Sequence, residues 1–322
     1  MDKLLNKIKK IIPSSLFKAL QPIYHYLLSF FSAFLYRWPS EKIIVIGVTG
    51  TTGKTTSAYL IAKALEAAGY KTGFTSTAMF NDGRREWLND KKMTMVGRLF
   101  TQRMLREMVK NGCRYAVVET TSEGVRQFRH RFINYDILVF TGLYPEHIES
   151  HGNFENYKEA KGRLFSHLKK CRTKYCDDKK IIHKATTGLR KTDLNRIKKT
   201  TVMNLDDEYA SYFSDFWAEE KIGFHNPITN YTPHNTKESN LKVIGFGDIK
   251  AGQTGTSFTV FTSALGGGGI GINLHLLGEF NVANAMTAVC VASTQGVSWA
   301  EIKKGLEGVE GVAGRLERID EG

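Results

Sequence analysis

The sequence predicts an α/β protein: a mostly parallel sheet, flanked by helices, that carries a small β-rich appendage. A β-branched run at Lys42–Val48 has the composition of a buried parallel strand, and a glycine-rich loop joins it to a helical pattern at Ala58–Ala68, which Gly69 ends. Two further apolar runs, Arg114–Glu119 and Asp136–Thr141, also read as buried strands. Polar residues follow these strands, and ligands bind at the carboxyl edge of open α/β sheets.

Composition narrows the class of protein without selecting a partner. The 322 residues suffice for about two domains, and a hydrophobic content of 42% excludes wholesale disorder. The 45 Lys and Arg against 32 Asp and Glu leave a net charge of +13, which is compatible with nucleic acid, an anionic membrane or a polyanionic substrate. The isolated pair Cys171 and Cys176 argues against a zinc site, and four cysteines fit a reducing cytoplasm.

Residues 1–40 form a basic amphipathic segment with its own character. Four lysines between Lys3 and Lys10 precede an apolar, aromatic run at Ile23–Tyr36. The run is shorter than the roughly 20 residues that span a bilayer, and no small-residue cleavage site follows it. We expect a helix, either lying on an anionic membrane surface or docked on the protein's own sheet.

The loop after the first strand has the composition of a phosphate-binding loop. We therefore predict a sheet of the P-loop type. Its residues are Gly50, Thr51, Thr52, Gly53, Lys54, Thr55 and Thr56. In such loops backbone N–H groups surround the phosphates, Lys54 would neutralise their charge, and the Thr55 hydroxyl would bind Mg²⁺. The strict pattern is not met, because its first glycine would fall at Val48. The alternative is an ordinary glycine-rich turn with a solvent-exposed lysine.

Three ionisable residues follow in chain order at positions suited to a metal site. Glu119 ends the second strand, His147 follows the third, and Lys161 lies in a helical segment. A carboxylate and an imidazole can hold Mg²⁺ beside a phosphate loop, although Mg²⁺ prefers oxygen ligands. From residue type alone, we expect Lys161 to be a solvent-exposed lysine on a helix. Residue type also does not single out His147 as a metal ligand.

The loop resembles the ATP loop of the Mur ligases, which join amino acids to UDP-N-acetylmuramoyl precursors of peptidoglycan. Folylpolyglutamate and cyanophycin synthetases share a related loop, so the loop alone indicates only the superfamily. Three further segments resemble the ligases that add the third peptide residue, the UDP-MurNAc-tripeptide synthetase type. They are Glu119–Arg129 (ETTSEGVRQFR), Phe140–Gly152 (FTGLYPEHIESHG) and Tyr157–Phe165 (YKEAKGRLF).

By this resemblance the chain is an ATP- and Mg²⁺-dependent ligase, and Lys54 is one of its catalytic residues. The resemblance implies that Glu119, His147 and Thr55 bind the metal and that Lys161 is the lysine that the family carbamylates. A carbamate would turn this cationic side chain into an anionic oxygen ligand.

The resemblance also implies substrate contacts at Thr94, Thr121, Gln127 and Arg129, with a plain surface arginine as the alternative for Arg129. Three departures affect substrate recognition more than ATP binding. A Ser-Glu pair, ending in Glu123, replaces the family's Ser-His; Glu-His replaces Asp-His at residues 146–147; and only Thr94 survives from an N-T-T motif.

The rest of the chain supplies two further motifs. Residues 169–200 form a basic insertion that we expect to be solvated, and no nucleic-acid partner is expected because interleaved aromatics are missing. Residues 240–277 form the β-rich appendage, with a hairpin about residues 266–269.

Near the end of the chain, Asn281 and Asn284 resemble the family's asparagines near adenine, while Asn281 could instead cap a helix. Arg315 resembles an arginine near the ATP phosphates.

Residues 41–322 are therefore expected to form a Mur-ligase-like central ATP-binding domain. The resemblance covers roughly residues 42–320, so we expect the family's uridine-binding and amino-acid-binding domains to be missing. The predicted function is addition of an amino acid to a UDP-N-acetylmuramoyl-peptide through an acyl phosphate, in the cytoplasm or at the inner face of the membrane. The alternatives are a folylpolyglutamate- or cyanophycin-type ligase and a non-catalytic, membrane-associated ATP-binding module.

Overall fold

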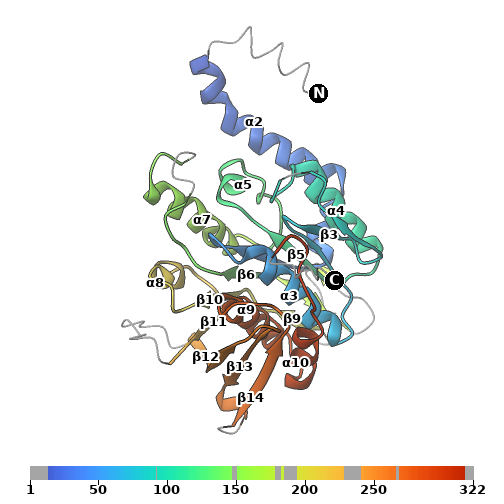
Figure 1. Ribbon diagram of the computed structural model, residues 1–322. Coiled ribbons are helices and arrows are strands. Elements are labelled where there is room, and N and C mark those ends of the chain that lie inside the picture. Colours follow the sequence, from blue (N-terminus) through green and yellow to red (C-terminus); the bar gives the residue numbers. More distant parts are fainter. Residues whose placement is uncertain are drawn as a thin grey trace, which may run out of the picture.

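The computed structural model describes most of the chain as one large sheet between layers of helices (Figure 1). The described residues are 14–91, 93–146, 151–177, 183–184, 194–227, 241–265 and 268–315. His147 and the lysines at positions 3–10 therefore lie outside the described residues. Within these ranges the large sheet has eleven strands in the order β14-β13-β12-β11-β10-β6-β1-β5-β2-β3-β4, and a separate three-stranded sheet has the order β8-β7-β9.

The centre of the sheet consists of the strands that the sequence predicts. Strand β1 (Ile44–Thr49) pairs in parallel with β5 (Tyr115–Glu119) and β6 (Ile137–Phe140). All residues of these three strands are buried, because helices cover both faces of the sheet. Burial on both faces explains the continuous β-branched runs in the sequence. The start of the predicted first strand is instead a 3₁₀ turn, η1 (Pro39–Lys42).

The remaining strands extend the sheet in both directions. On one side they are β2 (Thr72–Thr75), which is parallel to β5, and the antiparallel β3 (Met79–Asn81) and β4 (Glu86–Leu88). On the other side they are the parallel β10 (Thr200–Asn204), β11 (Glu220–His225) and β12 (Leu241–Ala251), followed by the antiparallel β13 (Thr256–Phe261) and β14 (Gly269–Leu274). The predicted hairpin is confirmed as β13 and β14, and these strands continue the main sheet.

Helices bury one apolar layer on each face of the sheet. One layer contains α3 (Lys54–Ala67), α9 (Phe280–Thr294) and α10 (Trp299–Glu307). The other contains α4 (Arg98–Lys110), α5 (Ser122–Arg126), α7 (Phe154–Leu168) and α8 (Ala210–Ser214). Helix α3 begins at Lys54, before the predicted start. The sequence pattern misses the first turn because that turn is polar and carries no apolar periodicity.

Helix α2 (Ser14–Leu35) projects from the body next to α4 (Figure 1). Its inner face, which includes Ser29, Ser32 and Ala33, is buried, whereas Phe31 and Phe34 on the outer face are exposed. The helix therefore docks on α4 and not on the sheet that one alternative named, and it leaves an apolar face uncovered. No helix in the described part of the chain is long and apolar enough to cross a membrane.

Two lysines of the basic insertion are buried, contrary to the expectation of a solvated segment. Lys174, at the start of β7 (Lys174–Cys176), and Lys199 both form ion pairs with Asp136, at 2.5 and 2.8 Å. All three side chains are at most 2% exposed. A buried ammonium group is tolerated when it is paired and hydrogen-bonded. The Lys174 ammonium also donates to the backbone carbonyls of Ile43 and Asn134. The small sheet, with β8 (His183–Lys184) and β9 (Asn195–Ile197), is fixed to the large one at this point.

Candidate nucleotide-binding site

A cavity of about 880 Å³ lies at the carboxyl edge of the parallel strands. Its lining includes residues that directly follow or end four strands, namely Gly50, Glu119, Thr141 and Asn204. Parallel strands present their carboxyl ends at one edge, so segments far apart in the sequence converge there. The cavity lies where the sequence predicts the ligand.

The predicted phosphate loop connects β1 to the first turn of α3 and borders this cavity. Gly53 has a left-handed φ of 75°, and a Cβ there would lie 2.2 Å from the Asn284 side-chain oxygen. Glycine is therefore required both by backbone conformation and by the close approach of α9. Lys54 Nζ donates to the Thr51 carbonyl at 2.6 Å, which folds this half-buried side chain over the loop. The amino terminus of α3 thus faces the cavity, as in anion-binding loops.

Oxygen-bearing side chains meet at the end of the loop. Thr55 Oγ1 donates to Glu119 Oε2 at 3.0 Å, and Glu119 also accepts from Thr77 N at 2.7 Å and Thr77 Oγ1 at 3.0 Å. Arg315 Nη2 donates to Thr55 Oγ1 at 3.2 Å, so the predicted arginine reaches the same point. Hydroxyl and carboxylate oxygens are ligands that suit Mg²⁺. Among the described residues, which exclude His147, no three acidic, imidazole or thiol groups gather as a metal cluster.

Lys161 is buried on α7 and points at the phosphate loop. It is 1% exposed, and its Nζ donates to the Gly50 carbonyl at 2.7 Å. Burial and the nearby charge of Lys54 lower the Lys161 pKa well below its ordinary value. The expectation from residue type, a solvated helix lysine, is therefore wrong. The cause is the packing of α7 over the loop, with Tyr157 donating to Thr51 Oγ1 at 3.2 Å.

The two asparagines predicted near adenine lie together on α9 and line the cavity. Asn284 Nδ2 donates to Asn281 Oδ1 at 2.9 Å, and Asn281 Nδ2 donates to the Leu277 carbonyl at 2.8 Å. The interpretation of Asn281 as a helix cap is wrong, because α9 begins at Phe280 and Glu279 is its N-cap residue. Phe280 also lines the cavity and is 59% exposed.

The four predicted substrate residues divide into two groups. Thr94 and Thr121 line the cavity, Thr94 sharing a hydrogen bond with Thr77 and Thr121 capping α5. Gln127 and Arg129 are not part of the lining. They bind each other, with Arg129 Nη2 donating to Gln127 Oε1 at 2.7 Å.

Arg129 is half-buried, so it is not the plain surface arginine of the alternative. Its guanidinium also donates to the Met95 carbonyl. Glu123, the departure from the family pattern, accepts from Gln127 Nε2 at 2.7 Å. The substituted carboxylate therefore takes part in holding this pair.

The structure also adds residues that sequence reasoning missed. Thr77 binds Glu119 through backbone and side chain, and Asp207 Oδ2 accepts from Leu143 N at 2.7 Å. Both line the cavity, and burial raises the pKa of Asp207. The sequence signal that could have identified Asp207 is its position just after the carboxyl end of β10.

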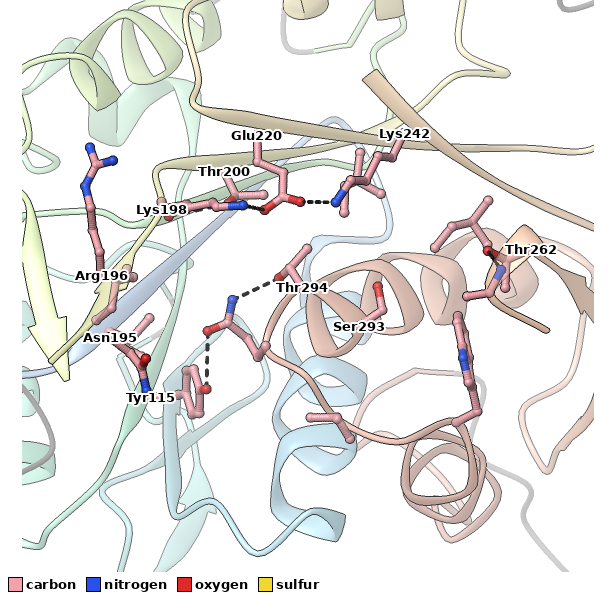
Figure 2. Close-up of a pocket in the computed structure, with 18 of the residues that line it drawn as sticks. Tyr115, Asn195, Arg196, Lys198, Thr200, Glu220, Lys242, Thr262, Ser293 and Thr294 are labelled. Atoms are coloured by element: carbon pink, nitrogen blue, oxygen red, sulfur yellow. Dashed lines mark hydrogen bonds and ion pairs between the residues drawn. The ribbon is translucent and has the colours of Figure 1, made fainter. Parts of the chain in front are cut away.

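A second cavity, of about 860 Å³, lies at the opposite, amino edge of the sheet. Figure 2 shows Glu220 between Lys198 and Lys242, with which it forms ion pairs at 3.8 and 2.6 Å. Tyr115, at the start of β5, donates to Gln295 at 3.3 Å in the same lining. None of the residues predicted for the nucleotide site belongs to its lining. The predicted residues therefore select the carboxyl-edge cavity.

Comparison with known proteins identifies relatives of this chain. The "UDP-N-acetylmuramyl-tripeptide synthetase" of Roseiflexus sp. is 33% identical over 90% of this chain and 52% of its own length. A 2,6-diaminopimelate ligase of Halalkalibacterium halodurans, "UDP-N-acetylmuramoyl-L-alanyl-D-glutamate--2,6-diaminopimelate ligase", is 31% identical over 88% of this chain and 50% of its own length. The chain thus spans about half the length of these relatives.

A solved structure and a family match complete the comparison. A structure of a "UDP-N-acetylmuramoyl-L-alanyl-D-glutamate--2, 6-diaminopimelate ligase" superimposes with a TM-score of 0.62 at 24% identity, covering 87% of this chain and 49% of the other. That likeness supports the fold. The family described as "Mur ligase middle domain" matches residues 48–199 and 191–292, which include the phosphate loop and Lys161. The chain belongs to the Mur ligase family.

Proposed function

We propose that this chain carries the ATP-binding and phosphoryl-transfer site of an ATP-dependent ligase that adds an amino acid to a UDP-N-acetylmuramoyl-peptide in the cytoplasm. The observation that carries the proposal is the convergence of Lys54, Thr55, Glu119 and Lys161 on one phosphate loop inside one cavity. The names of the relatives support the choice of substrate.

In the proposed reaction an oxygen of the peptide carboxylate attacks the γ-phosphorus of ATP. The bond to the β–γ bridging oxygen breaks, and its electron pair leaves with ADP. The amino-acid amine then attacks the carbonyl carbon of the acyl phosphate. Phosphate leaves with the electrons of the carbon–oxygen bond, and the amine nitrogen loses a proton.

Residues at the loop would stabilise the phosphoryl group during this transfer. The amino terminus of α3 and the Lys54 ammonium provide positive charge where the migrating phosphoryl group would lie, which is the main catalytic task in such transfers. Burial lowers the Lys54 pKa, while the nearby Glu119 and Glu146 act in the opposite direction. Thr55 and Glu119, with His147 from outside the described residues, would hold Mg²⁺, which neutralises phosphate charge.

Lys161 is the proposed site of carbamylation. Its buried, pKa-lowered amine is a nucleophile for CO₂: a nitrogen–carbon bond forms, one proton leaves, and a carbamate anion replaces the amine. The product would place anionic oxygens beside the loop in place of a buried amine. Its distance to the Gly50 carbonyl, 2.7 Å, puts Nζ directly against the phosphate loop.

Phosphate release distinguishes the proposed acceptor from the alternatives. We expect ADP and phosphate to form when UDP-muramoyl-dipeptide and an amino acid are supplied with ATP–Mg²⁺, and not when folates replace the dipeptide. Stimulation by folates alone would favour a folylpolyglutamate-type ligase. Binding of ATP–Mg²⁺ without amide formation from any acceptor would favour a nucleotide-binding module.

We also propose that α2 rests on an anionic membrane surface. Leu20, Ile23, Leu27, Phe31 and Phe34 recur at helical spacing on its outer face and are between 43% and 62% exposed. Contiguous exposed apolar residues of this kind mark interaction surfaces. From residue 3 to residue 40 the sequence has five lysines, one arginine and no acidic residue. This positive charge is complementary to anionic lipid, and it is not complementary to a second copy of the same basic chain.

A vesicle assay tests the membrane proposal. The full chain should sediment with phosphatidylglycerol vesicles and much less with phosphatidylcholine vesicles, and Leu27→Glu with Phe31→Glu should abolish the difference. Leu88→Glu is the matched control, because Leu88 is also an exposed apolar residue, at 65%, but lies on β4. A stable dimer that does not bind either vesicle would contradict the proposal.

A further inference from the structure

The inner face of α2 makes polar contacts with the beginning of α4. Arg98, the first residue of α4, donates through Nε to Ser29 Oγ at 3.0 Å and through Nη2 to His25 Nδ1 at 2.8 Å. His25 and Ser29 lie one turn apart on α2, so both face the same guanidinium. Three side chains from two helices thus form one cluster.

The same cluster binds the backbone of the turn that follows α5. Arg98 Nη2 also donates to the Gln127 carbonyl, and Ser29 Oγ donates to the Phe128 carbonyl at 2.9 Å. These carbonyls belong to the residues immediately before Arg129. Ser29 on α2 therefore binds the turn between α5 and β6 directly, across 99 residues of sequence, and Arg98 on α4 links the same turn to α2.

Aromatic packing from α2 holds the turn in an uncommon backbone conformation. Phe128 and Phe132 have φ values of 57° and 60°, in the left-handed region that bulky residues rarely adopt. Tyr26 contacts both rings, with centroid distances of 6.2 and 5.1 Å, and Phe30 contacts Phe132 at 5.5 Å. Such conformations persist only where surrounding contacts impose them, and here α2 provides them.

We propose that α2 is a positioning element of the substrate site, with Arg98 as the positioning residue that fixes the Gln127–Arg129 turn. The inference rests on the proposed function and on the substrate contacts that the family resemblance implies for Gln127 and Arg129. It assigns to α2 a function on its inner face that is independent of what its outer face contacts. It also assigns a role to Arg98, a residue outside the cavity lining.

The charges in the cluster fit an anionic group of the substrate. Burial, followed by the charges of Arg98 and Arg129, lowers the pKa of His25 to about 4, so at neutral pH its ring accepts from Arg98 without adding charge. Burial and Arg129 lower the pKa of Arg98 to about 10, which leaves it protonated. The charge of Arg129 thus acts on Arg98, and the positive charge at this turn favours a carboxylate or phosphate oxygen over a neutral group as the partner of Arg129.

The test compares Arg98→Gln with Arg103→Gln in the full chain. Arg103 lies on the same helix, is exposed, and stacks on Phe100 rather than contacting the turn. Hydrogen exchange of the amides of Gln127 and Arg129, which donate to the Glu123 and Gly124 carbonyls, should become at least tenfold faster in Arg98→Gln and stay unchanged in Arg103→Gln. Ser29→Ala, which removes one hydroxyl, should show a smaller change of the same kind.

Calorimetric binding of two ligands completes the test. In Arg98→Gln the Kd for UDP-muramoyl-dipeptide should rise on the order of tenfold, while the Kd for ATP–Mg²⁺ stays within about twofold. Unchanged hydrogen exchange, or equal loss of both ligands, would overturn the inference. If the unmodified chain does not bind the dipeptide, the proposed function fails, and the exchange rates still decide whether α2 fixes the turn.

Discussion

Replacing Asp136 by Asn should destabilise the fold strongly, because this carboxylate neutralises two buried lysines. Lys174 and Lys199 approach it at 2.5 and 2.8 Å, and all three side chains are at most 2% exposed. Breaking a buried ion pair by removing one partner costs about 3–5 kcal/mol. Since domains are stable by about 5–15 kcal/mol, the variant should still fold but unfold at a clearly lower denaturant concentration.

Urea unfolding followed by circular dichroism measures this effect, with Glu107→Gln as the control. Glu107 pairs with Lys110 at 2.8 Å, but both side chains are exposed, so the midpoint should remain close to that of the unmodified chain. An Asp136→Asn midpoint equal to that of Glu107→Gln would refute the reasoning. It would mean that water or another acid reaches the two lysines.

The pH dependence of the same variant has a definite sign. Burial already lowers the pKa of Lys174, and Asp136 is the main group that raises it again. Removing Asp136 lowers the pKa of folded Lys174 further below its unfolded value of 10.5. The unfolded state then binds more protons, so stability rises with pH. The deficit of the variant should be largest below the folded pKa and should shrink as the pH approaches 10.5; a constant deficit would contradict this account.

Three further predictions concern the nucleotide site. Lys161→Ala should abolish phosphate transfer, with partial rescue by short carboxylates, and unchanged turnover would exclude its proposed role. Gly53→Ala should weaken ATP binding at least tenfold, because the new Cβ would lie 2.2 Å from the Asn284 side-chain oxygen. Gly69→Ala is the control: Gly69 has a φ of 80° and open space around it, so the substitution imposes a similar backbone strain of about 1–2 kcal/mol without that contact. Glu119→Gln should weaken binding of ATP–Mg²⁺ but not of metal-free ATP, as measured by calorimetry, and equal effects on both would argue against a metal-binding role.

Much of the site could be predicted because its residues belong to local patterns. The phosphate loop is contiguous with a strand and a helix, so its place at the carboxyl edge follows from β1 and α3 alone. Glu119 ends a strand that the apolar pattern identifies, and parallel strands bring both to one edge. The roles of these residues, and the division of the chain into domains, remain predictions.

Other features depend on desolvation, which sequence patterns do not report. The composition of residues 169–200 predicts a solvated segment, but Lys174 and Lys199 are buried because Asp136 lies next to them in space. Lys161 is similar: its residue type predicts a solvated side chain, and the packing of α7 against the loop excludes water from it.

The sequence by itself determined the class of fold, the phosphate loop and the family segments, since each is encoded within a short stretch of chain. Only the tertiary structure decided which lysines are buried, which residue caps α9, and what the inner face of α2 contacts. The burial of the lysines and the contacts of α2 join segments that lie 38 to 131 residues apart in the sequence. Such contacts form only when the whole sheet and its two helical layers are assembled, because each is too weak to form before the chain entropy has been lost.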